Sequence, residues 1–433
     1  MIVRLVIGLG LLGIAAAAAA HRADGQWVVT IDRFGNPEYS TLNLLVDGTV
    51  ISGDWDGDAL KGSASIRRVT FTVTDSQHRT YAFNGRLDRG SLSGTAIFPD
   101  HNDPRSSLAY GFVARRVPDR PTPAPQSYNF VPTDYANSFS ADRTPLLTIW
   151  PGDTVRTTTV DSGGMDAQGV TRALFGNPQT GPFFIAGAAQ GDTVAVHIVK
   201  LTPNRDWADS LDTIVGRALG SGLATAAADL GKPVRWTLDR KAGTASPADA
   251  TGLLKDYRVP LRPMLGGLAL ANGSGMPPMS TGDTGRAGGN MDFPEVVAGN
   301  IVYLPVQQPG ALLYLGDAHA RQGDGETSQY ALETSMDVEF KIELIKRQVV
   351  STPRVESPTE LMALGQAGSL DEALKAATTG LIQWLRQDYG LTLTETAQVI
   401  GTGIRYSIPN LAGRSVGVAA RIDKSLLPPR LPH

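Results

Sequence analysis

Apolar side chains recur at every second position through much of the chain between residues 27 and 117. The clearest alternations, broken by Gly and Asp, are at residues 27–31, 40–46, 69–74 and 80–83. A period of two with β-branched and aromatic residues predicts strands. A turn, a short strand and a Gly recur together, as in a meander or a small barrel, at residues 47–53, 57–62 and 90–95. We therefore expect a small all-β domain over residues 24–117.

A proline-rich segment at residues 118–127 follows this domain. Its prolines predict a semi-rigid linker and therefore a domain boundary. Beyond it, Gly-Asp and Pro-Gly turns separate predicted strands at residues 146–150, 154–160, 183–185, 193–200, 299–305, 311–315 and 330–345. These strands predict a second, larger and β-rich domain over residues 128–433.

Two helices are predicted near the C-terminal end of this second domain. Ser369 with Glu372 has the spacing of a capping box, and apolar residues then recur at helical spacing as far as Gly390. Thr392 with Glu395 predicts a second, shorter helix. The predicted fold class is thus mainly β with some α, a β-rich α+β fold.

The first 23 residues are predicted to be a secretory signal peptide. One basic residue precedes an apolar run at residues 6–14, and the small residues at 15–20 offer a cleavage site. An uncleaved membrane anchor is the alternative, because the whole run is near the lower length limit of a membrane span. No other stretch is apolar over about 20 residues. We expect a periplasmic or secreted protein with no integral membrane segment after cleavage.

Charge and cysteine content restrict the function. The 39 basic and 42 acidic side chains give a formal net charge of −3, which favours neither nucleic acid nor an anionic membrane as a partner. The sequence contains no Cys, which excludes disulfides, thiolate metal sites and hydrolases with a Cys nucleophile.

One polar cluster, at residues 316–326, stands out. Three carboxylates and an imidazole lie close together in it, on Asp317, His319, Asp324 and Glu326. Asp317 and His319 are two residues apart, so on an extended segment they project to the same side. Oxygen and imidazole ligands suit a divalent ion, with zinc expected and calcium as the alternative. A solvated surface loop is the other interpretation of this segment.

Two further segments combine paired glycines with polar residues next to predicted strands. Asp161 follows the strand at 154–160 and precedes Gly163 and Gly164, while the segment 288–292 contains Asn290 and Asp292. Ligands often bind at such strand ends, so these side chains could converge on the 316–326 cluster. Each segment alone is also compatible with an ordinary Asx-type turn.

The segments 288–292, 304–312 and 316–326, in this order and at this spacing, resemble the acetamidase/formamidase family of amide hydrolases. Further matches extend the resemblance to residues 128–427. It implies hydrolysis of a short amide to a carboxylate and ammonia. It also implies a β-barrel or sandwich body with C-terminal helices, a divalent metal and a homo-oligomer.

The resemblance also suggests roles for individual residues. Glu326 is expected to be the general base. The expected metal ligands are Asp317 and His319, with Asp161 and Asp292 as further candidates, and the site-lining residues are Asn177, Asn290 and Asp324. Two positions depart from the family pattern, since Asn177 stands where the family usually has His and His197 where an acidic residue is common.

Two classes of function therefore remain open. The first is an exported amidase that cleaves a small amide of the formamide or acetamide type, which the intact 316–326 cluster favours. The second is a non-catalytic binding or assembly protein on the same fold, which Asn177 and the predicted export favour.

Overall fold

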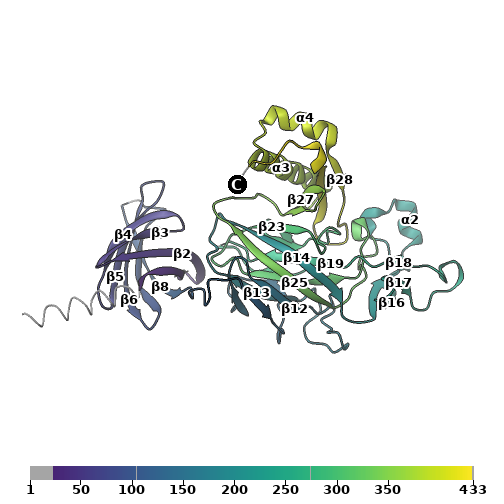
Figure 1. The fold of residues 1–433 in the computed structure, drawn as a ribbon, viewed down its shortest axis with the longest axis horizontal. Helices are drawn as coiled ribbons and strands as arrows, with labels where there is room; N and C mark the ends of the chain where they lie inside the picture. Colours follow the sequence, from purple (N-terminus) through teal and green to yellow (C-terminus); the bar gives the residue numbers. More distant parts are fainter. Residues whose placement is uncertain (1–22, 104, 274, 432–433) are drawn as a thin grey trace, which may run out of the picture. The chain divides into compact units, whose positions relative to one another are not determined.

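The computed structural model describes residues 23–103, 105–273 and 275–431, which divide into two compact units between Pro121 and Thr122. Figure 1 shows both units. The predicted signal peptide falls, except for Ala23, outside the described residues. Within the described ranges, no helix has the length and apolarity that a membrane span requires.

The first unit is a closed barrel of eight antiparallel strands, each paired with the next and the last paired with the first. Figure 1 shows it in purple to blue. The strands are β1 (Gly25–Arg33), β2 (Asn36–Asp47), β3 (Val50–Trp55), β4 (Asp58–Ala64), β5 (Arg68–Thr74), β6 (Thr80–Asp88), β7 (Ser91–Pro99) and β8 (Ser107–Arg116).

Alternating side chains of these strands fill the barrel interior. Trp27, Leu42 and Leu92 are among its fully buried apolar residues. Glycines let neighbouring strands approach and curl, because a Cβ on Gly62 or Gly94 would lie 2.0 Å from a carbonyl oxygen of the adjacent strand. The period-two pattern of the sequence thus corresponds to the inside and outside of a barrel.

The second unit is built on a sandwich of two large sheets. The nine-stranded sheet has the order β28 (Arg405–Ser407), β29 (Val416–Asp423), β27 (Glu360–Ala367), β26 (Arg354–Glu356), β23 (Ile301–Pro305), β14 (Thr193–Pro203), β25 (Met336–Ile345), β12 (Thr154–Thr158) and β9 (Ser127–Asn129). The six-stranded sheet has the order β11 (Leu147–Ile149), β13 (Gln179–Ile185), β24 (Leu313–His319), β19 (Met264–Leu270), β22 (Gly288–Asn290) and β21 (Thr284–Gly285). A separate pair joins β10 (Ser138–Phe139) and β20 (Met279–Ser280).

Apolar side chains of the two large sheets share one core, in which Phe183 of β13 packs edge-on against Phe340 of β25, with ring centroids 5.4 Å apart. The predicted mainly-β class with C-terminal helices is confirmed. Helix α3 (Leu370–Tyr389) packs its apolar face, including Trp384, on β27 and β29. Helix α4 (Leu393–Gly403) begins with the predicted capping box of Thr392 and Glu395, and the short η5 (Lys424–Leu426) follows β29.

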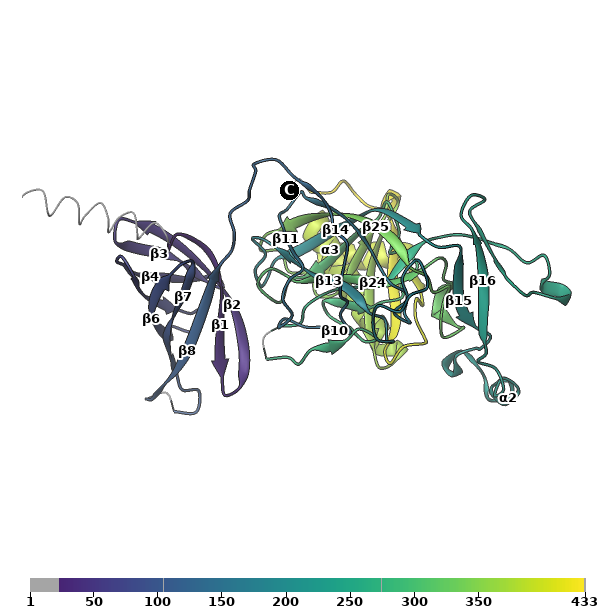
Figure 2. The ribbon, with the colours of Figure 1, turned by 90° about the horizontal axis from the view of Figure 1, so that it is seen from below.

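A third, smaller sheet extends from this body and was not predicted. Figure 2 shows two of its strands, β15 and β16, together with α2. The sheet consists of β15 (Trp207–Leu211), β16 (Pro233–Asp239), β17 (Thr244–Pro247) and β18 (Val259–Pro260), and between these strands lie η2 (Gly216–Ala218), α2 (Ser221–Ala226) and η3 (Gly252–Leu254). Its strands are short and mostly half-exposed, so the sequence lacks the long alternation that identifies a strand.

Candidate active site

Two of the predicted ligands come from β24, a strand of the six-stranded sheet that is buried along its whole length. Asp317 is 2% exposed and His319 is fully buried. Opposite them on β19 lies Gly266, where a Cβ would be 2.5 Å from Asp292 Oδ1 and 2.6 Å from Asp317 Oδ2. Only a residue without a side chain leaves room here for both carboxylates.

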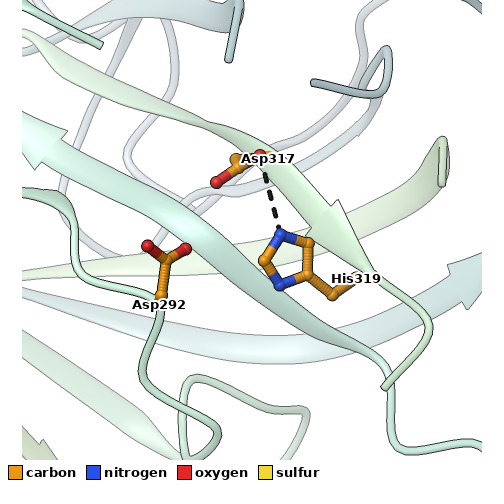
Figure 3. A group of neighbouring side chains, drawn as sticks. All are labelled: Asp292, Asp317 and His319. Atoms are coloured by element: carbon orange, nitrogen blue, oxygen red, sulfur yellow. Dashed lines mark ion pairs between the residues drawn. The ribbon is translucent and has the colours of Figure 1, made fainter. Parts of the chain in front are cut away.

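Asp292 reaches the same place from the loop after β22. Figure 3 shows its carboxylate together with Asp317 and His319. The ligand atoms of these three residues all lie within 4.8 Å of one another. Asp292 Oδ2 accepts hydrogen bonds from the side-chain amides of Asn290 (2.7 Å) and Asn410 (2.5 Å). The predicted convergence of the 288–292 and 316–326 segments is therefore present in the structure.

Asn177, just before β13, joins Asn290 and Asp317 through its side-chain amide. Its Nδ2 donates to Asn290 Oδ1 (2.9 Å) and to Asp317 Oδ2 (3.1 Å). Asn177 thus supplies a hydrogen-bond donor to the Asp317 carboxylate.

Glu326 and Glu333 complete the cluster around His319. Glu326 lies on the single turn η4 (Asp324–Glu326), and Glu333 precedes β25. One ligand atom from each lies within 4.8 Å of the other and of a ring nitrogen of His319. Both carboxyl groups are buried, at 7% and 5% exposure.

A single tautomer of His319 fits its surroundings. Gln322 Nε2 donates to the carbonyl oxygens of Asp292 (2.5 Å) and Pro409 (3.1 Å), so its Oε1 is left to face His319 Nδ1 at 2.9 Å. This amide oxygen can only accept, so Nδ1 carries the proton. In the neutral ring the lone pair is then on Nε2, which lies 3.2 Å from Glu333 Oε1 and 3.6 Å from Asp317 Oδ1.

Burial and crowded negative charge set the protonation of the cluster. Burial raises the pKa of Asp292 well above its ordinary value, and the Asp317 carboxylate raises it further. The pKa of Glu326 is raised well above its ordinary value by burial and then by Asp292, and burial also raises the pKa of Glu333. Burial lowers the pKa of His319, but Glu333 and Asp317 outweigh it, so the net direction is strongly upward.

Four buried polar atoms of this cluster have no hydrogen-bond partner among the described residues. They are Asp292 Oδ1, Asp317 Oδ1, His319 Nε2 and Glu333 Oε2. Buried polar atoms are rarely left without a partner, and buried carboxylates at this density are costly unless a cation neutralises them. The residues present therefore fit a divalent ion, and their oxygen and imidazole donors suit zinc.

The backbone at this site is itself unusual. Asn177, Asp292, Asp317 and Glu326 all have a positive φ, between 43° and 58°. This left-handed conformation is uncommon outside glycine and costs of order 1–3 kcal/mol per residue, so it persists where the surrounding structure enforces it. Such a concentration of strained positions at one cluster is typical of functional sites.

Two predicted site residues lie outside the cluster. Asp161 forms a buried ion pair with Arg205, with Oδ2 and Nη1 2.8 Å apart. Asp324 is exposed on η4, and its pKa is raised by partial burial, with Arg421 opposing the shift. His197 lies on β14, with its Nε2 3.1 Å from Glu343 Oε2. It belongs to neither of the two sets of possible ligands around His319.

Three residues that complete the site were not selected from the sequence. Gln322 lies inside the 316–326 cluster, three residues after His319, and this spacing could have indicated a contact between the two side chains. Glu333 lies in an alternating segment that is typical of an ordinary strand. Asn410 is 118 positions from Asp292, and no local pattern joins them.

Sequence comparison gives two matches for the second unit. Residues 278–363 match the profile of the acetamidase/formamidase family. A protein of Schizosaccharomyces pombe that is a formamidase by name is 40% identical over 75 residues, which make up 17% of this chain and 18% of that protein. The aligned segment thus spans less than a fifth of the curated relative.

Structural comparison covers more of the chain. An acetamidase from Yersinia enterocolitica is similar with a TM-score of 0.61 and 29% identity, over 70% of this chain and 94% of that chain. A predicted acetamidase/formamidase from Thermoanaerobacter tengcongensis has a TM-score of 0.59 and 24% identity, over 70% and 97%. At 24% identity, the similarity to the Thermoanaerobacter protein shows a shared fold and nothing more.

Proposed function

The resemblance of this chain to the acetamidase/formamidase family is confirmed, and on this premise we propose that the protein is an amide hydrolase. Its substrate is a short-chain amide of the formamide or acetamide type, which water converts to a carboxylate and ammonia. The strongest support is the buried cluster of Asp292, Asp317, His319, Glu326 and Glu333, in which four polar atoms have no hydrogen bond among the described residues.

The residues that would hold the metal are Asp292, Asp317, His319 and Glu333. Zinc is the ion proposed, with calcium as the alternative. When bound, such an ion supplies Lewis acidity toward an amide carbonyl and toward water. Glu333 replaces Asp161 in this set, because Arg205 already neutralises Asp161.

Glu326 is the proposed general base. Its carboxylate accepts a proton from the attacking water and then delivers a proton to the leaving nitrogen, so that ammonia departs. Burial and the neighbouring Asp292 raise its pKa toward the range in which a carboxylate exchanges protons efficiently at neutral pH.

The other side chains hold this arrangement in place. Asn177 donates to Asp317, while Asn290 and Asn410 donate to Asp292, so the amides orient the carboxylate oxygens. Gln322 keeps the His319 ring in the tautomer with a free Nε2. The low exposure of these residues limits the access of bulk water.

The test is ammonia release from formamide and acetamide by purified protein, with metal content measured before and after chelation. We expect stoichiometric metal and ammonia release that the chelator abolishes. Glu326→Gln should keep the metal and lower kcat by about 10²–10⁴-fold. Glu372→Gln on the exposed start of α3 is the matched control and should match the wild type. Normal turnover of metal-loaded Glu326→Gln would refute the assignment of the base.

A non-catalytic binding or assembly role is the second candidate, and Asn177 in place of the family's usual His favours it. Its signature in the same experiment is protein that contains no metal and releases no ammonia from either amide. Bound metal without ammonia would instead direct the search to other amide substrates.

Export and self-association are further parts of the proposal. The apolar N-terminal run supports secretion to the periplasm or the medium, and the N-terminal sequence of the exported protein would identify the cleavage site. The resemblance to the acetamidase/formamidase family supports a homo-oligomer. Light scattering during size exclusion would give its mass.

A further inference from the structure

The residues that face the barrel interior become polar or aromatic toward one end of the barrel. Alternate residues of each strand point inward, and over most of the barrel they are buried and apolar. At one end the inward-facing rows continue into polar or aromatic residues. Each lies two positions from a buried apolar residue of a strand, either in that strand or directly after it. The pairs are Arg33 with Ile31, Asp58 with Leu60, Asp75 with Val73, Tyr81 with Phe83 and Phe98 with Ala96.

These residues line a cavity of about 310 Å³ at the end of the barrel. An eight-stranded barrel has an interior that side chains fill or that holds one small ligand, and barrel mouths are common ligand sites. Packing alone does not require charged side chains at inward positions. Their presence around a cavity therefore points to a ligand.

The charges in this cavity are not balanced. Both of its arginines are already paired, Arg33 with Glu38 at 3.1 Å and Arg79 with Asp75 at 2.7 Å. Asp56 and Asp58 also line the cavity, and in the described ranges neither forms an ion pair with a basic side chain. Asp56 Oδ1 accepts the backbone N–H of Thr41 at 2.7 Å, which fixes its carboxylate. A ligand thus meets an excess of negative charge.

Aromatic rings form the remaining wall. Trp55 packs on Phe83 with ring centroids 4.5 Å apart, and Tyr81 packs on Phe98 at 4.9 Å. Tyr81 donates its hydroxyl to Asp75 at 2.8 Å, which holds the ring in place. The Arg33 guanidinium lies 5.4 Å from the centre of the Phe98 ring, so this wall already stabilises one cation in the structure.

We propose that the mouth of the β1–β8 barrel binds a small organic ammonium cation. Ring faces attract such a cation through their quadrupole, and the two unpaired carboxylates add charge complementarity. An anion would meet the excess of carboxylates, and a bare metal ion would gain little from the aromatic wall. This site is independent of the proposed amidase chemistry, because all of its residues belong to the first unit.

The test is calorimetric titration of the full chain with choline and with its uncharged isostere 3,3-dimethylbutan-1-ol. We expect choline to bind about tenfold or more tightly than the isostere. Asp58→Asn and Trp55→Leu should each weaken choline binding about tenfold, whereas Trp55→Phe retains most of it. Asp88→Asn, at the exposed last residue of β6 and away from the cavity end of that strand, is the matched control and should bind as the wild type.

Thermal unfolding of each variant checks that the barrel is intact, and wild-type melting with lost choline binding supports the proposal. Equal binding of choline and the isostere would overturn it, as would unchanged binding by Asp58→Asn. Displacement of choline by calcium chloride would show an inorganic cation site instead. Binding to phosphatidylcholine vesicles but not to free choline would show a lipid headgroup site and would also overturn it.

Discussion

A single methyl group at Gly266 should disable the proposed metal site. Gly266 lies on β19 opposite Asp317, and Gly266→Ala places a Cβ 2.5 Å from Asp292 Oδ1 and 2.6 Å from Asp317 Oδ2. The Asp317 carbonyl oxygen is also only 2.9 Å from that Cβ. Ordinary contact begins near 3.4 Å, so Asp292 Oδ1 must move by about 0.9 Å and Asp317 Oδ2 by about 0.8 Å.

This displacement sets the expected size of the effect. Metal ligands must hold their distances within about 0.2 Å, so a movement of about 0.9 Å removes one or both carboxylates from coordination. We expect zinc affinity to fall by about 100-fold or more and ammonia release to fall with it. Overpacking at a buried site also lowers the free energy of unfolding by about 1–3 kcal/mol.

Competition with a chromophoric chelator measures the zinc affinity, and urea unfolding of metal-free protein measures the stability. Gly368→Ala is the matched control, because its Cβ would have no heavy atom within 4 Å. A Gly266→Ala protein that binds zinc within twofold of the wild type would refute the placement of the metal between Asp292 and Asp317.

Two further predictions concern the same cluster. Gln322→Leu removes the acceptor for His319 Nδ1 and should weaken zinc binding about 10–100-fold in the same competition assay; unchanged affinity would mean that the amide does not position the ring. The stabilisation by zinc should grow as pH rises from about 5 to 8, measured as the difference in melting temperature between zinc-loaded and metal-free protein. The pKa values of the buried carboxyl groups are raised in the folded chain, so the metal-free fold binds more protons than the unfolded chain, and their contribution to stability is lost as pH rises through those values. His319 acts in the same direction, because its net pKa shift is upward, whereas zinc requires the deprotonated ligands. A zinc increment that is flat or decreasing with pH would contradict this reasoning.

Local sequence rules were sufficient where the determining contacts are local. The capping box of Thr392 and Glu395 depends on residues within one helix. The strand predicted at residues 311–315 is present only in part, because β24 spans Leu313–His319 and so includes Asp317 and His319. The strand-end position of the 288–292 segment also indicated that its side chains could converge on the 316–326 cluster.

Local rules failed where a tertiary partner decides the role of a side chain. Asp161 is a residue type that commonly binds metal ions, but here it forms an ion pair with Arg205. No local sequence pattern predicts that pair. Asp324 and Glu326 lie on one short turn, yet the positive φ of Gly325 and Glu326 leaves one exposed and the other buried. Glu333 reaches His319 only because an isolated bridge joins the segment before β25 to the end of β24.

Three asparagines offset part of the energetic cost of the backbone conformation and the charge crowding at this site. Positive φ at Asn177, Asp292 and Asp317 is unfavourable, and closely spaced buried carboxylates add repulsion. Three side-chain amides, from Asn177, Asn290 and Asn410, offset part of this cost by donating to the carboxylates without adding charge. A neutral donor at position 177 keeps Asp317 oriented and leaves the cluster with its negative charge, which a divalent cation requires. Asn177 is therefore compatible with the proposed metal site, in which Asp292, Asp317, His319 and Glu333 would be the ligands.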